Sequence, residues 1–127
     1  MQKLEEYATE ITPAKNMKVQ ATVQQCSDEV QLPVEIRHNI FLLCKEAINN
    51  AVKYSGASLL QLNMRHADHT IIFSVADNGK GFDRATIKKG NGLLNMQKRA
   101  EAVGATLVLK SEPQQGTVIS LQCKITQ

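Results

Sequence analysis

The sequence is poor in aromatic residues and contains no tryptophan, so its core must be built from aliphatic side chains. Aromatic residues make up 4% of the 127 residues, whereas hydrophobic residues make up 43%, an ordinary share for a globular protein. No apolar run reaches the length of a membrane span, and the first residues lack the apolar segment of a secretion signal. A chain of this length is expected to form one domain with a substantial core.

Cysteine and histidine are also sparse, and neither shows the spacing of metal ligands. The cysteines are three in number, and no C-x-x-C pair occurs. We therefore interpret them as small buried residues in a reducing compartment, and we expect the histidines at the surface. These residues are Cys26, Cys44 and Cys123, and His38, His66 and His69.

Basic residues are not gathered into a patch. The chain has 15 Lys and Arg residues against 12 Asp and Glu residues, a net charge of +3, and the basic residues are scattered along it. No aromatic residues interleave with them. A dedicated nucleic-acid surface combines clustered basic residues with aromatic stacking platforms, so we expect no nucleic-acid partner.

The spacing of apolar residues predicts a layered α/β fold. Three segments show helical spacing and five show the alternation of strands. The helical segments are 3–11, 34–54 and 93–103, and the strands are 17–23, 58–66, 70–76, 105–110 and 117–125. Pro33 is expected in the first turn of the long helix, with Gly56 and Gly104 ending the two longer helices. This order predicts a two-layer α/β sandwich, with helices on one face of a mixed sheet.

A polar stripe runs along the otherwise apolar helix at 34–54. At about 100° per residue, Asn50 lies about 40° round the helix from Glu46, and Lys53 lies about 20° to the other side. Asn49 and Asn50 are poor helix formers, which indicates a role other than helix stability. A carboxylate and an amide oxygen that converge suit Mg²⁺ and the phosphates it carries. The alternative is an ordinary solvated helix face.

Glycine-bearing segments occur where a ligand can approach the backbone. Asp77-Asn78-Gly79-Lys80-Gly81 follows a strand; turn chemistry explains the first glycine, but the second allows close ligand approach and loop movement. Asp77 is placed there to accept a hydrogen bond from an exocyclic amine. Gly90-Asn91-Gly92 opens a helix, where free N–H groups favour an anion; a flexible linker capped by Asn91 is the alternative. Gly116-Thr117 fits either a tight turn or a hydroxyl contact to a base.

In this order and spacing, the segments resemble the ATP-binding catalytic domain of bacterial sensor histidine kinases, within the wider family of gyrase, Hsp90 and MutL. The resemblance extends from about residue 17 onward and implies the Bergerat-type ATP-binding fold. It rests on Glu46-x-x-x-Asn50-x-x-Lys53-Tyr54 (similar to the N box), Asp77-x-Gly79-x-Gly81 (G1 box), Gly90-Asn91-Gly92-Leu93 (G2 box) and Gly116-Thr117 (the last glycine motif). The run 45–55 is most similar to the nitrate-sensor and DesK-like subgroup.

The resemblance implies ATP and Mg²⁺ as ligands and assigns roles to individual residues. Asn50 is implied to coordinate Mg²⁺ through its amide oxygen, and Glu46 to orient or polarise the attacking nucleophile or a metal-bound water. Asp77 is implied to bond the adenine amino group, helped by Thr117. The remaining implied contacts are Lys53 and Tyr54 to phosphate or ribose, Gly79 and Gly81 to shape the pocket and hinge the lid, and Gly90, Gly92 and Leu93 to cover the phosphates.

The resemblance also implies partners outside this chain. Kinases of this kind transfer the γ-phosphate to a histidine on a separate dimeric helical domain, which then supplies a response regulator receiver domain. Because His38, His66 and His69 all lie within the nucleotide-binding region, we expect no phosphoacceptor here. We expect residues 1–12 to be the tail of the upstream helical domain and 13–127 to be the ATP-binding domain. That domain is expected to be cytoplasmic without membrane contact of its own, in a parent protein that is either inner-membrane anchored or free.

Three alternatives stay open at this point. The first is a serine kinase of the anti-sigma-factor type, which shares the fold. The second is a non-catalytic nucleotide-binding module that signals through the order of its lid. The third is a purely structural α/β domain. A large gyrase-type ATPase is disfavoured because it requires further domains.

Overall fold

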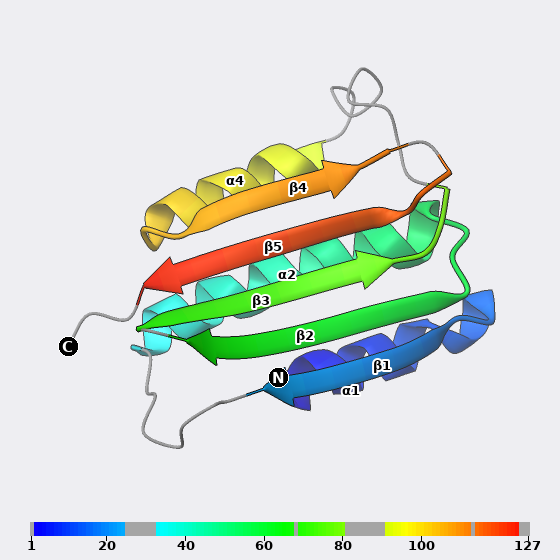
Figure 1. Cartoon of the computed structure of the whole chain (residues 1–127), viewed down its shortest axis with the longest axis horizontal. Coiled ribbons are helices and arrows are strands. Elements are labelled where there is room, and N and C mark those ends of the chain that lie inside the picture. Colours follow the sequence, from blue (N-terminus) through cyan, green and yellow to red (C-terminus); the bar gives the residue numbers. More distant parts are fainter. Residues whose placement is uncertain (1, 25–32, 68, 81–90, 113, 125–127) are drawn as a thin grey trace.

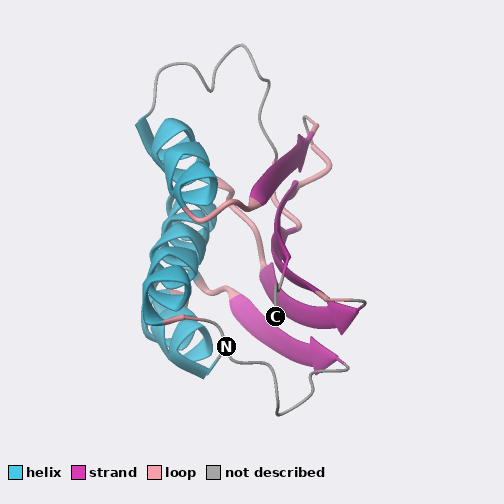
Figure 2. Ribbon diagram, turned by 90° about the vertical axis from the view of Figure 1, so that its left-hand side faces the viewer, coloured by secondary structure: helices cyan, strands magenta, loops and turns pink. Residues whose placement is uncertain are grey.

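The computed structural model describes residues 2–24, 33–67, 69–80, 91–112 and 114–124, which form a five-stranded sheet and a layer of helices (Figure 1). An edge-on view shows the helices together on one side of the sheet (Figure 2). The helices are α1 (Gln2–Ile11), the short 3₁₀ helix η1 (Pro13–Lys15), α2 (Val34–Tyr54) and α4 (Asn91–Ala102). The strands are β1 (Lys18–Gln24), β2 (Leu59–Ala67), β3 (Thr70–Asp77), β4 (Thr106–Ser111) and β5 (Thr117–Lys124). The predicted two-layer α/β sandwich is confirmed.

The sheet is mixed, as expected, with the strand order β1-β2-β3-β5-β4. β1 and β2 are parallel. Parallel neighbours require a crossover connection, and the chain between these two strands contains α2, which provides it. The other pairs, β2–β3, β3–β5 and β4–β5, are antiparallel. As a result, the start of β2, the end of β3, the start of β5 and the end of β4 all lie at the same end of the strands, and these strand ends form one edge of the sheet.

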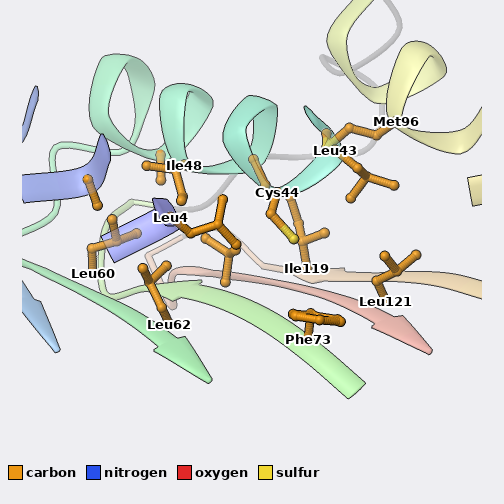
Figure 3. Close-up of a cluster of buried hydrophobic side chains, with 14 of the residues drawn as sticks. Leu4, Leu43, Cys44, Ile48, Leu60, Leu62, Phe73, Met96, Ile119 and Leu121 are labelled. Carbon is orange, nitrogen blue, oxygen red and sulfur yellow. The ribbon is translucent and has the colours of Figure 1, made fainter. Parts of the chain in front are cut away.

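The core lies between α2 and the sheet and is aliphatic, as the low aromatic content predicts. Figure 3 shows Leu43 and Ile48 of α2 facing Leu60, Leu62 and other strand residues. Ile48 and Leu60 have 0% exposure, and full burial of one such side chain contributes about 1.5–3 kcal/mol. This burial holds α2 in a fixed position over the sheet.

Helix α1 packs into the same core. Leu4 and Ala8 are buried among the core residues, which places α1 beside α2 in the helical layer. The assignment of residues 1–12 to an upstream helical segment stays a prediction.

The bounds of α2 match the prediction, whereas those of α1 and α4 differ from it by one or two residues. Pro33 is the N-cap of α2 rather than part of its first turn, because its extended ψ of 148° places it just outside the helix. Asn91 is the first residue of α4, so Asn91 and Gly92 lie within the helix and not before it. Gly56 and Gly104 have φ values of +66° and +69°, which confirms their predicted positions as helix stops.

The sparse cysteines and histidines lie largely as expected. Cys44 and Cys123 are buried, whereas Cys26 lies outside the described residues. Complete burial raises the pKa of the Cys44 thiol to about 12, so this thiol stays protonated and behaves as a small apolar group. His38 and His69 are exposed and His66 is half-buried.

The described residues contain neither a candidate metal-binding cluster nor a candidate membrane-spanning helix. Among those residues, no group of three or more His, Cys, Asp and Glu side chains could hold a metal ion. In the same part of the chain, no helix is long and apolar enough to cross a membrane.

Candidate functional site

The described parts of the four motifs lie at one edge of the sheet. The C-terminal half of α2 leads into β2, and β3 ends at Asp77. β5 begins at Thr117, and α4 begins at Asn91. These ends lie together at the right of Figure 1. The fold therefore gathers the predicted site segments. Gly81 and Gly90 lie outside the described residues, as do the side chains of Tyr54 and Leu93.

The polar stripe on α2 lies at the border of the helical layer. Glu46 and Asn50 are half-buried and Lys53 is exposed, whereas the flanking Ala47 and Ile48 are buried against the sheet. The predicted pattern is thus confirmed: α2 is a core helix that carries a row of partly or fully exposed polar side chains. The roles of these side chains in binding phosphate or metal stay predictions.

A pocket of about 180 Å³ lies over this part of α2, between α1 and α4. Glu46 and Asn49 line it from α2, and Arg99 lines it from α4. Asn50 is not among its lining residues. The complete lining is Tyr7, Leu42, Lys45, Glu46, Asn49, Asn95, Met96 and Arg99. Sequence reasoning missed the α4 residues, although Asn95 and Arg99 are spaced by one helical turn and their position on one helix face was a usable signal.

Asp77 is a carboxylate held in place by backbone donors. The N–H of Gly79 donates to Asp77 Oδ1 at 2.9 Å, and the backbone N–H of Thr117 also donates to this carboxylate. Burial raises the pKa of Asp77, and these two hydrogen bonds act in the opposite direction by stabilising the ionised form. The result is an oriented, partly desolvated hydrogen-bond acceptor at the edge of the sheet.

Gly79 allows the loop after β3 to pack against the end of α2. A Cβ atom at Gly79 would overlap the carbonyl oxygen of Ser55 and would lie 2.7 Å from Ser55 Cβ. The neighbouring Lys80 N–H donates to the same carbonyl at 2.9 Å. Sequence reasoning assigned Gly79 to ligand approach and lid hinging, whereas the contact seen here is with Ser55. Because Gly79 has no side chain, the loop after β3 and the end of α2 can lie in direct contact at the site.

Asn78 ties the same loop to the start of β2. Its Oδ1 accepts the N–H groups of Ser58 and Leu59 at 2.9 and 3.0 Å, and its Nδ2 donates to Ser58 Oγ at 3.0 Å. Because Leu60 pairs with Asp77 in the β2–β3 register, these bonds support the strand end that carries the carboxylate. The sequence motif left this residue without a role.

Thr117 lies beside Asp77 and contacts a residue that sequence reasoning also missed. Thr117 pairs with Asp77 on β3 and with Ser111 on β4, and it is 6% exposed. The hydroxyl oxygens of Ser111 and Thr117 are 2.8 Å apart. Gly116, with φ +81°, precedes Thr117, and a Cβ there would overlap the carbonyl oxygen of Asp77. A polar row thus crosses three strands at this edge.

Together, an oriented carboxylate, closely packed glycine turns, and a polar helix end beside a helix N-terminus are typical of a nucleotide-binding domain built as a two-layer α/β sandwich. The chain belongs to the family of histidine kinase-, DNA gyrase B- and HSP90-like ATPases, whose family model matches residues 35–127. This membership confirms the predicted family and fold, and ATP as the nucleotide.

Two curated relatives are sensor kinases from staphylococci. The chain is 34% identical over 94 residues to the oxygen sensor histidine kinase NreB of Staphylococcus carnosus, covering 72% of this chain and 27% of that protein. It is 30% identical over 112 residues to the sensor protein VraS of Staphylococcus aureus, covering 87% and 31%. The chain thus spans less than a third of the length of either relative.

A solved structure shows the same fold. The blue-light activated histidine kinase EL346 of Erythrobacter litoralis superposes with a TM-score of 0.80 at 24% sequence identity, covering 98% of this chain and 41% of that one. At this identity the similarity supports the architecture of the domain.

Proposed function

We propose that this chain is the catalytic domain of a two-component histidine kinase, which transfers the γ-phosphate of ATP to a histidine on a separate helical domain. The names of the curated relatives favour this activity over the gyrase-like and HSP90-like activities of the wider family. The observation that carries the proposal is the Asp77 carboxylate, oriented by the N–H groups of Gly79 and Thr117 at the edge where the four motifs meet.

In this proposal, Asp77 recognises the adenine base. Adenine presents an exocyclic amine that donates hydrogen bonds, whereas guanine presents a carbonyl oxygen at the same place. The carboxylate is half-buried and held by two backbone donors, so it accepts from the amine and repels the carbonyl. Thr117 contributes beside it through its hydroxyl.

The phosphates are proposed to lie along the polar edge of α2, towards the start of α4. Asn50 supplies an amide oxygen to Mg²⁺; one protein ligand is consistent with an ion held largely by phosphates and water, the usual arrangement for nucleotide-bound Mg²⁺. When bound, Mg²⁺ neutralises phosphate charge. Glu46 orients the attacking group, and Lys53 and Tyr54 contact phosphate or ribose.

The lid assignment is part of the same proposal. Gly81 hinges the segment that follows β3, and Gly90, Gly92 and Leu93 bring the start of α4 over the phosphates. Two of these residues, Gly92 and Leu93, lie in the first turn of α4, where unpaired backbone N–H groups favour an anion.

One proposed partner belongs to the longer parent protein, and the other receives the phosphoryl group from it. They are a dimeric helical domain carrying the phosphoacceptor histidine, joined through residues 1–12, and a response regulator receiver domain. This assignment places the domain in the cytoplasm, where ATP and the receiver are available.

Phosphotransfer is tested with γ-labelled ATP and Mg²⁺. The isolated chain should remain unlabelled, and addition of the upstream helical domain of the parent protein should give label on that domain. The linkage should be acid-labile, as phosphohistidine is. Acid-stable label on an added protein would support the serine-kinase alternative, and ATP binding with no transfer to the helical domain would support a non-catalytic module. Strong labelling of the isolated chain would contradict the absence of a phosphoacceptor here.

A further inference from the structure

Ser111 and Thr117 form a hydroxyl pair at the candidate base site. Ser111 Oγ lies 2.8 Å from Thr117 Oγ1 and 3.3 Å from the carbonyl oxygen of Gly116. Ser111, Thr117 and Asp77 occupy directly opposite positions on β4, β5 and β3. Opposite residues in antiparallel pairs point to the same face. All three side chains therefore lie on the helix side of the sheet, where the nucleotide is proposed to bind.

Two proton arrangements are consistent with the contacts of this pair to each other and to the Gly116 carbonyl, because hydroxyl protons rotate to suit their partners. In the first, Thr117 donates to Ser111, and Ser111 donates to the Gly116 carbonyl. Thr117 then offers only a lone pair to a ligand. In the second, Ser111 donates to Thr117, and the Thr117 proton is available to a ligand. The direction of the proton on Ser111 thus decides whether Thr117 acts as a donor or as an acceptor.

A bound adenine selects between these arrangements. Thr117 donates its backbone N–H to the Asp77 carboxylate, so its side chain lies next to the group that would bind the exocyclic amine. On the adenine ring, the atom adjacent to the amine-bearing carbon is N1, which carries a lone pair and requires a donor. Only the second arrangement supplies one.

We propose that Ser111 is a positioning residue for adenine recognition. Its hydroxyl donates to Thr117 Oγ1 and directs the Thr117 proton towards N1 of the base, either directly or through one water. A hydroxyl that accepts a hydrogen bond is also a stronger donor, so Ser111 strengthens the contact it orients. This inference rests on the proposed adenine contact of Asp77.

The test compares ATP with its 1-deaza analogue, in which a C–H group replaces N1 and the exocyclic amine is kept. The measured quantity is the ratio of the two dissociation constants, obtained by calorimetry. In the unaltered chain the analogue should bind roughly three- to tenfold more weakly, the range for one neutral hydrogen bond. In Ser111→Ala the Thr117 hydroxyl keeps its proton but is no longer oriented or polarised by Ser111, so ATP binding should weaken more than analogue binding and the ratio should fall by about twofold.

Two further variants separate orientation from a general structural effect. Ser111→Thr keeps a hydroxyl at this position and should restore the ratio. Ser120→Ala is the matched control: Ser120 is also a half-buried serine, on β5, but it alternates with the buried residues and faces away from the helices. This control should leave the ratio unchanged.

The outcomes distinguish this inference from the proposed function. If Ser111→Ala weakens ATP and the analogue equally, Ser111 has only a structural role and the inference is wrong, while the ATP site stands. A ratio near one in the unaltered chain means that N1 is not read, which also overturns the inference. Failure of the unaltered, folded chain to bind either nucleotide would instead contradict the proposed function.

Discussion

Replacing Gly79 with alanine tests whether the site depends on the close contact between the β3 loop and the end of α2. The added Cβ would overlap the Ser55 carbonyl oxygen and lie 2.7 Å from Ser55 Cβ. The overlapping atoms are backbone and a Cβ, and neither is the end of a flexible side chain, so the loop must shift. Overpacking of this kind costs about 1–3 kcal/mol.

The same strain should appear in nucleotide affinity. In the free domain, the loop can move away from Ser55 and relieve the overlap. In the complex, Asp77 must return to its original place to meet the base, so binding restores the strain. A strain of about 2 kcal/mol corresponds to about a 30-fold loss of affinity for ATP.

Gly104→Ala is the control for this experiment. Gly104 also accepts no side chain without strain, because its φ is +69°, but a Cβ there meets nothing within 4 Å, and it lies where α4 ends, away from the site. This change should cost about 1 kcal/mol of folding stability and leave ATP affinity unchanged. Titration calorimetry with a non-hydrolysable ATP analogue, and thermal melting of both variants, provide the measurements. A Gly79→Ala domain that binds within twofold of the unaltered chain would refute this account of the loop.

Three further predictions concern charge, metal and core. Burial raises the folded-state pKa of Asp77 above its unfolded value. The contribution of Asp77 to folding stability is therefore present at pH values below the unfolded pKa and is lost as the pH rises through the folded pKa. At neutral pH, Asp77→Asn should consequently melt no lower than the unaltered chain. The same change should reduce the preference for ATP over GTP, and an unchanged base preference would exclude the proposed adenine contact. In the unaltered chain, ATP affinity should fall as the pH is lowered through the raised pKa of Asp77, and in Asp77→Asn this fall should be absent. Asn50→Ala should weaken only the Mg²⁺-dependent part of ATP-analogue binding, measured with and without the metal; equal weakening in EDTA would argue against metal ligation. Ile48→Ala should destabilise the domain by about 2–5 kcal/mol in urea unfolding, whereas Val34→Ala, at a position 69% exposed, should have little effect; similar losses would contradict the assigned core.

Much of the fold could be predicted because its signals are local. The long helix at 34–54 was predicted with its observed bounds, since its apolar spacing lies within the segment and Pro33 and Gly56 flank it closely on either side. The strands were predicted within one or two residues from their alternation. The start of α4 was predicted two residues too late, because Gly92 disfavours helix in isolation and the first two residues of the helix were assigned to the preceding loop.

The supporting residues of the site could not be predicted, because their partners depend on strand register. Ser111 is an ordinary strand residue in the sequence, and only the pairing of β4 with β5 brings it to Thr117. Asn78 looked like part of a turn, and its bonds to Ser58 and Leu59 require β2 and β3 to be aligned first. The sequence motifs identified the residues that are proposed to bind the ligand, but not the residues that position them.

The row that joins Leu60, Asp77, Thr117 and Ser111 across four strands also links ligand affinity to the cooperativity of folding. The donors that orient the Asp77 carboxylate come from Gly79 and Thr117, and Asn78 fastens that strand end to β2. The acceptor is therefore oriented only after β2, β3 and β5 have assembled, so partly folded chains should have little affinity for ATP. Saturating nucleotide should consequently protect the amides of these central strands from hydrogen exchange and raise the midpoint of global unfolding.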